Sequence, residues 1–122
     1  MKTFVVALAI AAAGGAQTQT PVPAQPRAAA PAGNAENGKK LFTSDGCYEC
    51  HGREAQGSTA TGSRLAPRPM AFAAFSKYVG QPTGQMPPYT SKVVSDADLA
   101  DIYAFLQSRP APPALESIQL LK

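Results

Sequence analysis

Cysteines, histidines and charged residues are all scarce in this chain, and the composition excludes several classes of protein. Two cysteines in 122 residues exclude a disulfide-dense scaffold, and His51 is the only histidine. Charged residues make up 16% of the sequence, well below the usual quarter or so. The Lys and Arg residues form no run or stripe, so the sequence lacks the basic patch that is typical of a nucleic-acid-binding protein. The length also excludes a large multi-domain enzyme.

Long apolar runs are missing as well. The longest covers residues 4–13 and is too short for a membrane span, which needs roughly 20 apolar residues. Lys2 precedes this run, and the small residues Gly14, Gly15 and Ala16 follow it, as in a secretory signal peptide that is cleaved after Ala16. We therefore expect residues 1–16 to direct export to the periplasm, with no membrane span in the mature chain. An uncleaved N-terminal anchor or a buried helix is the alternative.

Proline-rich segments border the central part of the chain. Residues 17–33 are rich in Ala, Pro, Gln and Thr and have only one large apolar residue, Val22, which predicts a disordered spacer. Residues 110–122, the C-terminal tail, begin in the same way and end in a more apolar stretch, for which docking and fraying are the two alternatives. The domain expected between them, residues 34–109, has a size at which a protein-only core is marginal.

Apolar residues recur at helical spacing in three segments of this domain. The first predicted helix follows the N-cap residue Asn34, the second covers residues 71–79, and the third follows a capping box that begins at Ser95. No segment shows the sustained alternation of a strand, so the sequence predicts an all-α fold. Residues 53–68 and 81–94 remain as long loops. Such loops are unusual in so small a domain unless they surround a bound group.

The sequence Cys47-Tyr48-Glu49-Cys50-His51 is the C-x-x-C-H attachment motif of c-type haem. Each thiol of such a motif forms a thioether bond with one vinyl group, and the adjacent imidazole reaches the iron from the same side. Three other interpretations compete with it. A structural disulfide needs no histidine, a thioredoxin-like dithiol needs a βαβ context, and a zinc site needs more ligands than two cysteines and one histidine.

A histidine-bound iron has a second axial position, and two methionines are candidates for it. Met86 lies in a loop where two prolines follow it and stiffen the chain, so its thioether can be held against a metal. Met70 lies beside the second predicted helix, where methionine is usually core filling. A small molecule at an open position is the third option. The pattern favours Met86.

The chain resembles the class I c-type cytochromes over residues 34–109. The motifs that carry this resemblance come in the family's order: residues 38–42, 47–51, 62–65, 86–87 and 98–106. The resemblance implies a cytochrome c fold, with three to four short helices and long loops wrapped around one covalently attached haem c. It also implies that the first and last helices cross, with Gly38 and Phe42 meeting Ile102 and either Phe105 or Leu106.

The resemblance further implies the residues of the haem site. These are Cys47 and Cys50 as thioethers, His51 as proximal and Met86 as distal iron ligand, and Leu65 as a cofactor contact. Ser63 stands where the family usually has a proline whose carbonyl accepts the imidazole N–H. Four side chains are further candidates for contact with the haem propionates: Tyr48, Arg64, Arg68 and Tyr89.

The function expected from these residues is one-electron transfer between redox proteins by a carrier that is not itself an enzyme. A dehydrogenase or cytochrome complex is the expected donor and an oxidase the expected acceptor, with the chain as a monomer. Two other functions stay open. One is a dedicated haem subunit of a periplasmic dehydrogenase, and the other is a gas-binding haem sensor or enzyme with an open sixth position.

Overall fold

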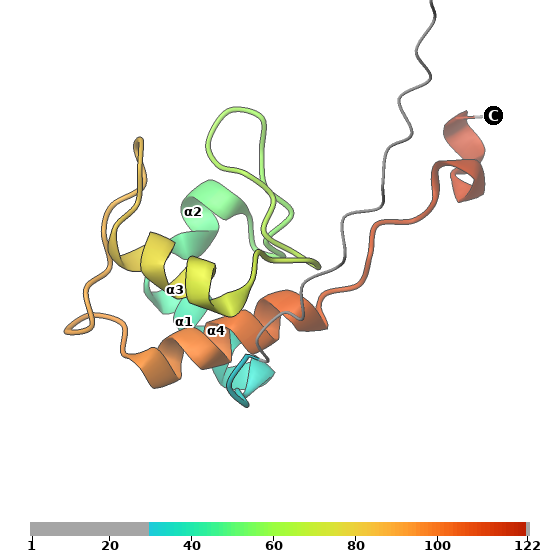
Figure 1. Cartoon of the computed structure of the whole chain (residues 1–122). Coiled ribbons are helices and arrows are strands. Elements are labelled where there is room, and N and C mark those ends of the chain that lie inside the picture. Colours follow the sequence, from blue (N-terminus) through green and yellow to red (C-terminus); the bar gives the residue numbers. More distant parts are fainter. Residues whose placement is uncertain (1–29, 122) are drawn as a thin grey trace, which may run out of the picture.

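The computed structural model describes residues 30–121, which form four α-helices and two short 3-10 helices, with no β-strand among them (Figure 1). The elements are α1 (Ala35–Ser44), α2 (Cys47–His51), α3 (Phe72–Gly80), α4 (Asp96–Ser108), η1 (Leu115–Ser117) and η2 (Gln119–Leu121). The all-α fold is therefore confirmed. The predicted signal peptide, residues 1–16, lies outside the described residues, as does the predicted spacer up to residue 29.

The caps predicted for the first and last helices are present. The side chain of Asn34 accepts hydrogen bonds from two backbone N–H groups of the first turn of α1. Ser95 and Asp98 form a reciprocal capping box at the start of α4. The middle helix begins after Ala71, one residue later than predicted, and includes Gly80 as its last residue. Local sequence signals thus place all three helix starts to within one residue.

Helices α1 and α4 cross and form the most extensive contact between two helices within residues 30–121 (Figure 1). Gly38 is buried at this crossing, and a Cβ atom there would overlap the backbone carbonyl of Asp101. The rings of Phe42 and Phe105 pack beside it, with centroids 5.3 Å apart. The contacts expected from the resemblance are therefore present, and only glycine lets the two backbones come so near.

Asp101 ties the start of α1 to the middle of α4. Its carboxylate accepts a hydrogen bond from the backbone N–H of Asn34 at 2.6 Å and another from the Asn37 side chain at 2.8 Å. These two donors hold the pKa of Asp101 below its ordinary value, with the Asn37 side chain as the larger cause. Two residues of the predicted spacer also reach this region, because Ala30 packs against the core and Gly33 lies on the α4 backbone.

An aromatic cluster joins α3 to α4. The Tyr103 ring lies 5.2 Å from the ring of Phe72 and 5.4 Å from that of Phe75, measured between centroids. The Tyr103 hydroxyl donates a hydrogen bond to the backbone carbonyl of Met70 at 2.9 Å. This bond anchors the segment that leads into α3. Helix α4 is therefore the central element, with α1 and α3 both packed on it.

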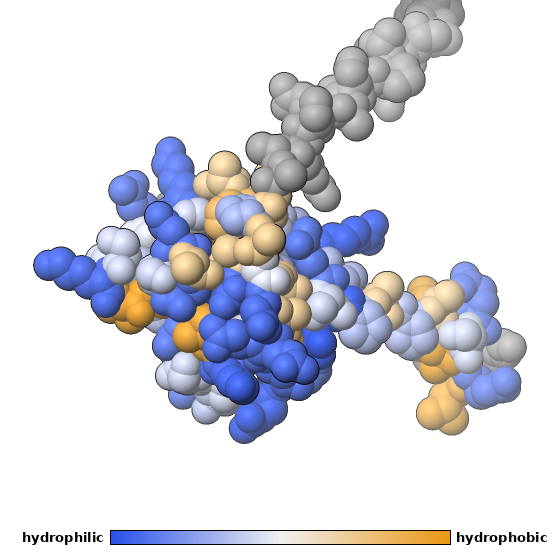
Figure 2. Space-filling model, turned by 90° about the horizontal axis from the view of Figure 1, so that it is seen from below, coloured by the Kyte–Doolittle hydropathy of each residue, from blue (hydrophilic) through white to orange (hydrophobic). Residues whose placement is uncertain are grey.

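The C-terminal tail extends beyond the helical domain (Figure 1). Its side chains are mostly exposed, with Leu115 at 70% and Leu120 at 95% of full exposure. Figure 2 shows apolar atoms gathered at the end of this tail, separate from the body of the domain. No helix within residues 30–121 is both long enough and apolar enough to cross a membrane.

Gly38→Ala should destabilise the protein, although alanine is the better helix former by about 1 kcal/mol. The added methyl group has no room against the α4 backbone, and overpacking of this kind costs typically 1–3 kcal/mol. Chemical denaturation of the intact protein measures the loss. Lys40→Ala, at an exposed position of the same helix, is the control and should change stability by less than about 0.5 kcal/mol. Equal stabilities of the two variants would contradict the close approach.

The stabilising contribution of Asp101 should disappear in acid. Because its pKa is lower in the folded protein than in the unfolded chain, this contribution is complete above the unfolded value of about 3.9 and is lost as pH falls through the folded value. Asp101→Asn should therefore lower the denaturation midpoint at neutral pH and flatten its decline in acid. Denaturation series against pH test this, with Glu116→Gln in the tail as control. An unchanged acid profile in Asp101→Asn would refute it.

Candidate functional site

Helix α2 is a single turn that carries the whole C-x-x-C-H motif. Gly46 precedes it with φ +76° and Gly52 follows it with φ +77°, a left-handed backbone region that favours glycine. Glycine at both ends lets the chain turn sharply into and out of this short helix. The turn places Cys47, Cys50 and His51 on one short scaffold directly after α1.

The imidazole of His51 is oriented by the loop that follows α2. Its Nδ1–H donates a hydrogen bond to the backbone carbonyl of Ser63 at 2.8 Å. A carbonyl oxygen can only accept, so Nδ1 carries the proton, and in a neutral ring Nε2 keeps a free lone pair. This is the state in which imidazole binds a metal. The hydrogen bond implied by the resemblance is thus present, with serine in place of proline.

Two neighbours of Ser63 fix the same loop to α2. The Thr61 hydroxyl donates a hydrogen bond to the carbonyl of Cys50 at 2.8 Å. A Cβ atom on Gly62 would lie 2.9 Å from that carbonyl oxygen and 3.1 Å from His51 Nδ1, so a larger residue would press on both. Sequence reasoning missed the role of Thr61, because no local pattern links a loop threonine to a carbonyl eleven residues earlier.

The two cysteines are free thiols, with Cys47 half-buried and Cys50 exposed. Burial raises the pKa of the Cys47 thiol to about 11, and the negative charge of Asp45 adds to the shift. The thiol is therefore protonated at neutral pH, whereas zinc ligands and redox-active dithiols act as thiolates. Among residues 30–121, no group of three or more Cys, His, Asp or Glu side chains is arranged as a metal site.

The loop that contains Met86 is fastened at both ends. The Tyr89 N–H donates to the carbonyl of Val79 at 2.9 Å, and the Tyr89 hydroxyl donates to the carbonyl of Asp45 at 2.8 Å. At the other end, the Tyr78 hydroxyl donates to the carbonyl of Thr83 at 3.0 Å. The loop therefore connects the end of α3 with the residues just before α2. Met86 itself is half-buried within it.

Tyr89 lies close to the cysteines. Burial raises the pKa of its phenol, and Cys47 and Asp45 are the largest charged contributors to the same shift. The hydrogen bond from the Tyr89 hydroxyl to the Asp45 carbonyl places the loop of Met86 beside α2. Met70, by contrast, is 48% exposed, and its backbone carbonyl is engaged by Tyr103.

The candidate propionate contacts lie around α2 and in the loop that follows it, except Tyr89. The guanidinium of Arg53 lies 4.9 Å from the centre of the Tyr48 ring, and Arg64 Nε donates to the carbonyl of Gln56 at 3.2 Å. Arg68 is exposed. Leu65 is half-buried against the core, and its N–H donates to the carbonyl of Ala55 at 3.0 Å.

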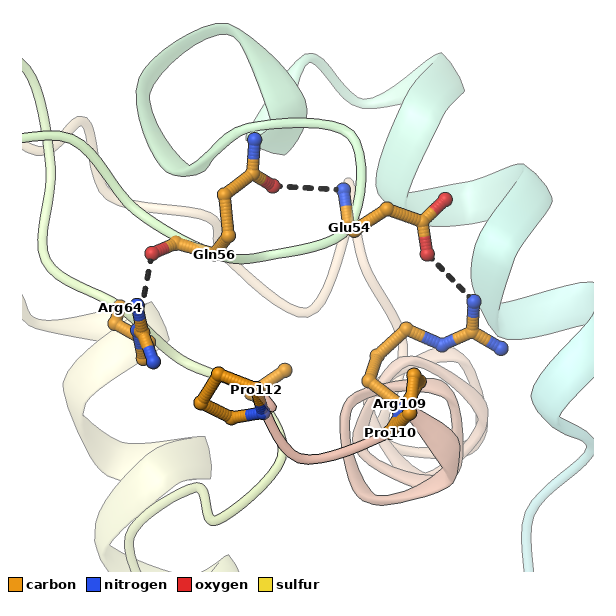
Figure 3. A pocket seen from close by; sticks show the side chains of 7 residues that line it. Glu54, Gln56, Arg64, Arg109, Pro110 and Pro112 are labelled. Carbon is orange, nitrogen blue, oxygen red and sulfur yellow. Dashed lines mark hydrogen bonds and ion pairs between the residues drawn. The ribbon is translucent and has the colours of Figure 1, made fainter. Parts of the chain in front are cut away.

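A pocket of about 170 Å³ opens between the loop after α2 and the start of the C-terminal tail (Figure 3). It is smaller than most ligand sites, which are about 300–1,000 Å³, and none of Cys47, Cys50, His51 and Met86 lines it. An ion pair of 2.6 Å between Glu54 and Arg109 forms one wall. The pocket therefore lies where the loop after α2 meets the start of the C-terminal tail, and it is separate from α2 itself.

Comparison with known families decides among the remaining interpretations. The family described as cytochrome c oxidase, cbb3-type, subunit III matches residues 33–106. The chain belongs to this family. No curated protein and no solved structure matches it.

Membership in the cbb3-type subunit III family confirms two predictions from the sequence. The chain is a small c-type cytochrome, and its cofactor is covalently bound haem c. The chemistry of α2 fits this cofactor, since it offers two thiols at C-x-x-C spacing and an imidazole whose Nε2 is left to bind a metal. Haem-based electron transfer is the general function that follows from the family.

Proposed function

We propose that this cytochrome is a one-electron carrier whose haem is held by α2 and by the two loops that flank it. The observation that carries the proposal is the hydrogen bond from His51 Nδ1 to the Ser63 carbonyl, next to two free thiols on the same helical turn. It fixes one imidazole tautomer and one ring orientation. The bound haem would supply an iron that alternates between its ferric and ferrous states.

The cysteines and the histidine have separate roles in this proposal. Cys47 and Cys50 form the two thioether bonds, and His51 Nε2 binds the iron as proximal ligand. The Ser63 carbonyl positions the imidazole by accepting the Nδ1–H hydrogen bond. The same bond makes Nε2 a stronger electron-pair donor to the iron. Leu65 contributes apolar surface from the same loop.

Met86 is the distal ligand in this proposal. Its loop is tied to α3 through Tyr78 and to the segment before α2 through Tyr89, so the thioether is carried by a restrained segment. Histidine–methionine ligation raises the reduction potential. It also occupies both axial positions, so no iron site is open to a substrate, which suits a carrier rather than an enzyme.

The proposed partners are redox proteins outside the cytoplasm. The family is named after an oxidase subunit, which supports an oxidase as electron acceptor, with a dehydrogenase or cytochrome complex as donor. Export through residues 1–16 would place the chain in the periplasm. A mature N-terminus at Gln17 in the periplasmic fraction would support this location, and retention of Met1 would contradict it. The exposed leucines of the tail favour a second possibility, a haem subunit docked in a larger dehydrogenase.

Replacement of either cysteine should break covalent attachment. Cys47→Ala and Cys50→Ala each leave at most one thioether bond, so both should yield little holoprotein. Denaturing gels stained for haem peroxidase activity measure this directly. Ser44→Ala, a conservative change just before α2, should retain full staining. Haem that leaves the wild-type protein under these conditions would refute the thioether assignment.

The two methionines should behave in opposite ways when removed. Met86→Ala should keep the haem attached, lower the reduction potential and let the reduced protein bind carbon monoxide readily, because the soft thioether that favours ferrous iron is lost. Met70→Ala should leave carbon monoxide binding as poor as in the wild type and cost less than the roughly 2–5 kcal/mol of a fully buried methionine, since it is partly exposed. Rapid binding by the wild type would instead support a sensor or enzyme with an open sixth position.

A further inference from the structure

Met86 lies midway between two hydrogen bonds that tyrosine hydroxyls make to backbone carbonyls. Three residues before Met86, the Thr83 carbonyl accepts from the Tyr78 hydroxyl at 3.0 Å. Three residues after Met86, the Tyr89 hydroxyl donates to the Asp45 carbonyl at 2.8 Å. Because the same type of bond restrains the loop on both sides of Met86, the contributions of the two bonds can be compared directly.

The two bonds differ in the parts of the chain that they join. Tyr78 lies near the end of α3, only five residues before Thr83, so its bond closes a short segment on itself. Asp45 lies 44 residues before Tyr89 and is the C-cap residue of α1, just before the start of α2 (Figure 1). The Tyr89–Asp45 bond therefore joins the loop of Met86 to the chain that enters the C-x-x-C-H helix, and the Tyr78 bond does not.

Tyr89 is also held by α3 and by the core. Its backbone N–H donates to the Val79 carbonyl at 2.9 Å. Its half-buried ring packs against the hydrophobic core, as do the side chains of Val79 and Cys47. With its hydroxyl on Asp45, this one residue sets how the loop of Met86 lies relative to both α3 and the start of α2.

The acceptor of the Tyr89 hydroxyl belongs to a rigid part of the domain. The N–H of Asp45 donates to the Leu41 carbonyl at 2.9 Å, and the N–H of Gly46 donates to the Thr43 carbonyl at 3.2 Å. Both carbonyls belong to α1, which is packed closely on α4 at Gly38. The Asp45 carbonyl is therefore fixed by α1 and α4, and the bond positions the loop rather than the reverse.

We infer that the Tyr89 hydroxyl is the positioning group that keeps the loop of Met86 closed over α2. This inference rests on the proposed function, because it takes Met86 as the distal ligand. When the Tyr89–Asp45 bond breaks, the loop is released from the segment before α2 while the Tyr78 bond stays intact, so Met86 can move away from His51. The thioether would bind the iron, and the phenol acts only through the loop.

This role differs from a contact between Tyr89 and a haem propionate. A phenol has one proton, so its hydroxyl cannot donate to the Asp45 carbonyl and to a propionate at the same time. Loss of a propionate contact would leave the loop of Met86 closed. Loss of the bond to Asp45 would open it, so the two roles predict different results for the same substitution.

Carbon monoxide binding to the reduced full-length holoprotein measures how often the loop opens. The gas binds only while the sixth position of the iron is free, so its binding rate follows the fraction of molecules in the open state. Tyr89→Phe keeps the ring and removes only the hydroxyl. The net contribution of one hydrogen bond corresponds to a binding rate that is roughly three- to tenfold higher in this variant. In the oxidised variant, the absorption band that reports the bond between the thioether sulfur and iron should be weaker.

Two further variants control for other effects of the substitution. Tyr78→Phe removes the matching bond on the other side of Met86 and should raise the rate less than about twofold, since the Tyr89–Asp45 bond still holds the loop. Asp101→Asn weakens the contact between α1 and α4 without touching the loop, and its binding rate should stay close to that of the wild type. It therefore separates opening of the loop from a general loss of stability.

A faster rate in Tyr89→Phe alone, with haem still attached, supports the inference. An unchanged rate in Tyr89→Phe would overturn it, as would an equal acceleration in Tyr78→Phe or in Asp101→Asn. Rapid binding already in the wild type, with no thioether band in its oxidised form, would contradict Met86 as distal ligand and the inference with it. That failure is distinguishable, because it is seen before any residue is replaced.

Discussion

The close approach of α1 and α4 at Gly38 fixes the position of the other elements. Helix α2 follows α1 after only Asp45 and Gly46, so the crossing also sets where the C-x-x-C-H turn lies relative to α4. Helix α3 packs on the other part of α4 through Tyr103. The position of each element that carries a proposed haem-binding residue is therefore set, directly or through α1 and α3, by the largely buried helix α4. A larger residue at Gly38 would move the site as well as the crossing.

The two long loops have a physical reason to be ordered. Each one satisfies a backbone carbonyl at or beside α2 that no helix bond uses, through Thr61 in one case and Tyr89 in the other. Unpaired carbonyls in a partly buried region cost free energy, so these side chains stabilise the loop and the helix together. The consequence for function is that the residues proposed to bind iron from opposite sides, His51 and Met86, are each supported by a separate loop.

Much of the fold follows from the sequence because its signals are local. Asn34 and the Ser95 capping box mark helix starts through bonds to residues within three positions. The family resemblance also led to the Ser63 carbonyl as partner of His51. The role of Tyr89 was not predictable in this way. Its hydroxyl bonds to the Asp45 carbonyl, a partner set by how distant segments meet in space.

The most direct test of the account is an optical redox titration of the purified full chain. The account predicts a single one-electron step between two forms that both have the spectrum of six-coordinate, low-spin haem, because His51 and Met86 stay bound in each. The reduced spectrum should also stay unchanged for minutes under carbon monoxide. A five-coordinate, high-spin reduced form that takes up carbon monoxide at once would contradict the electron-carrier assignment.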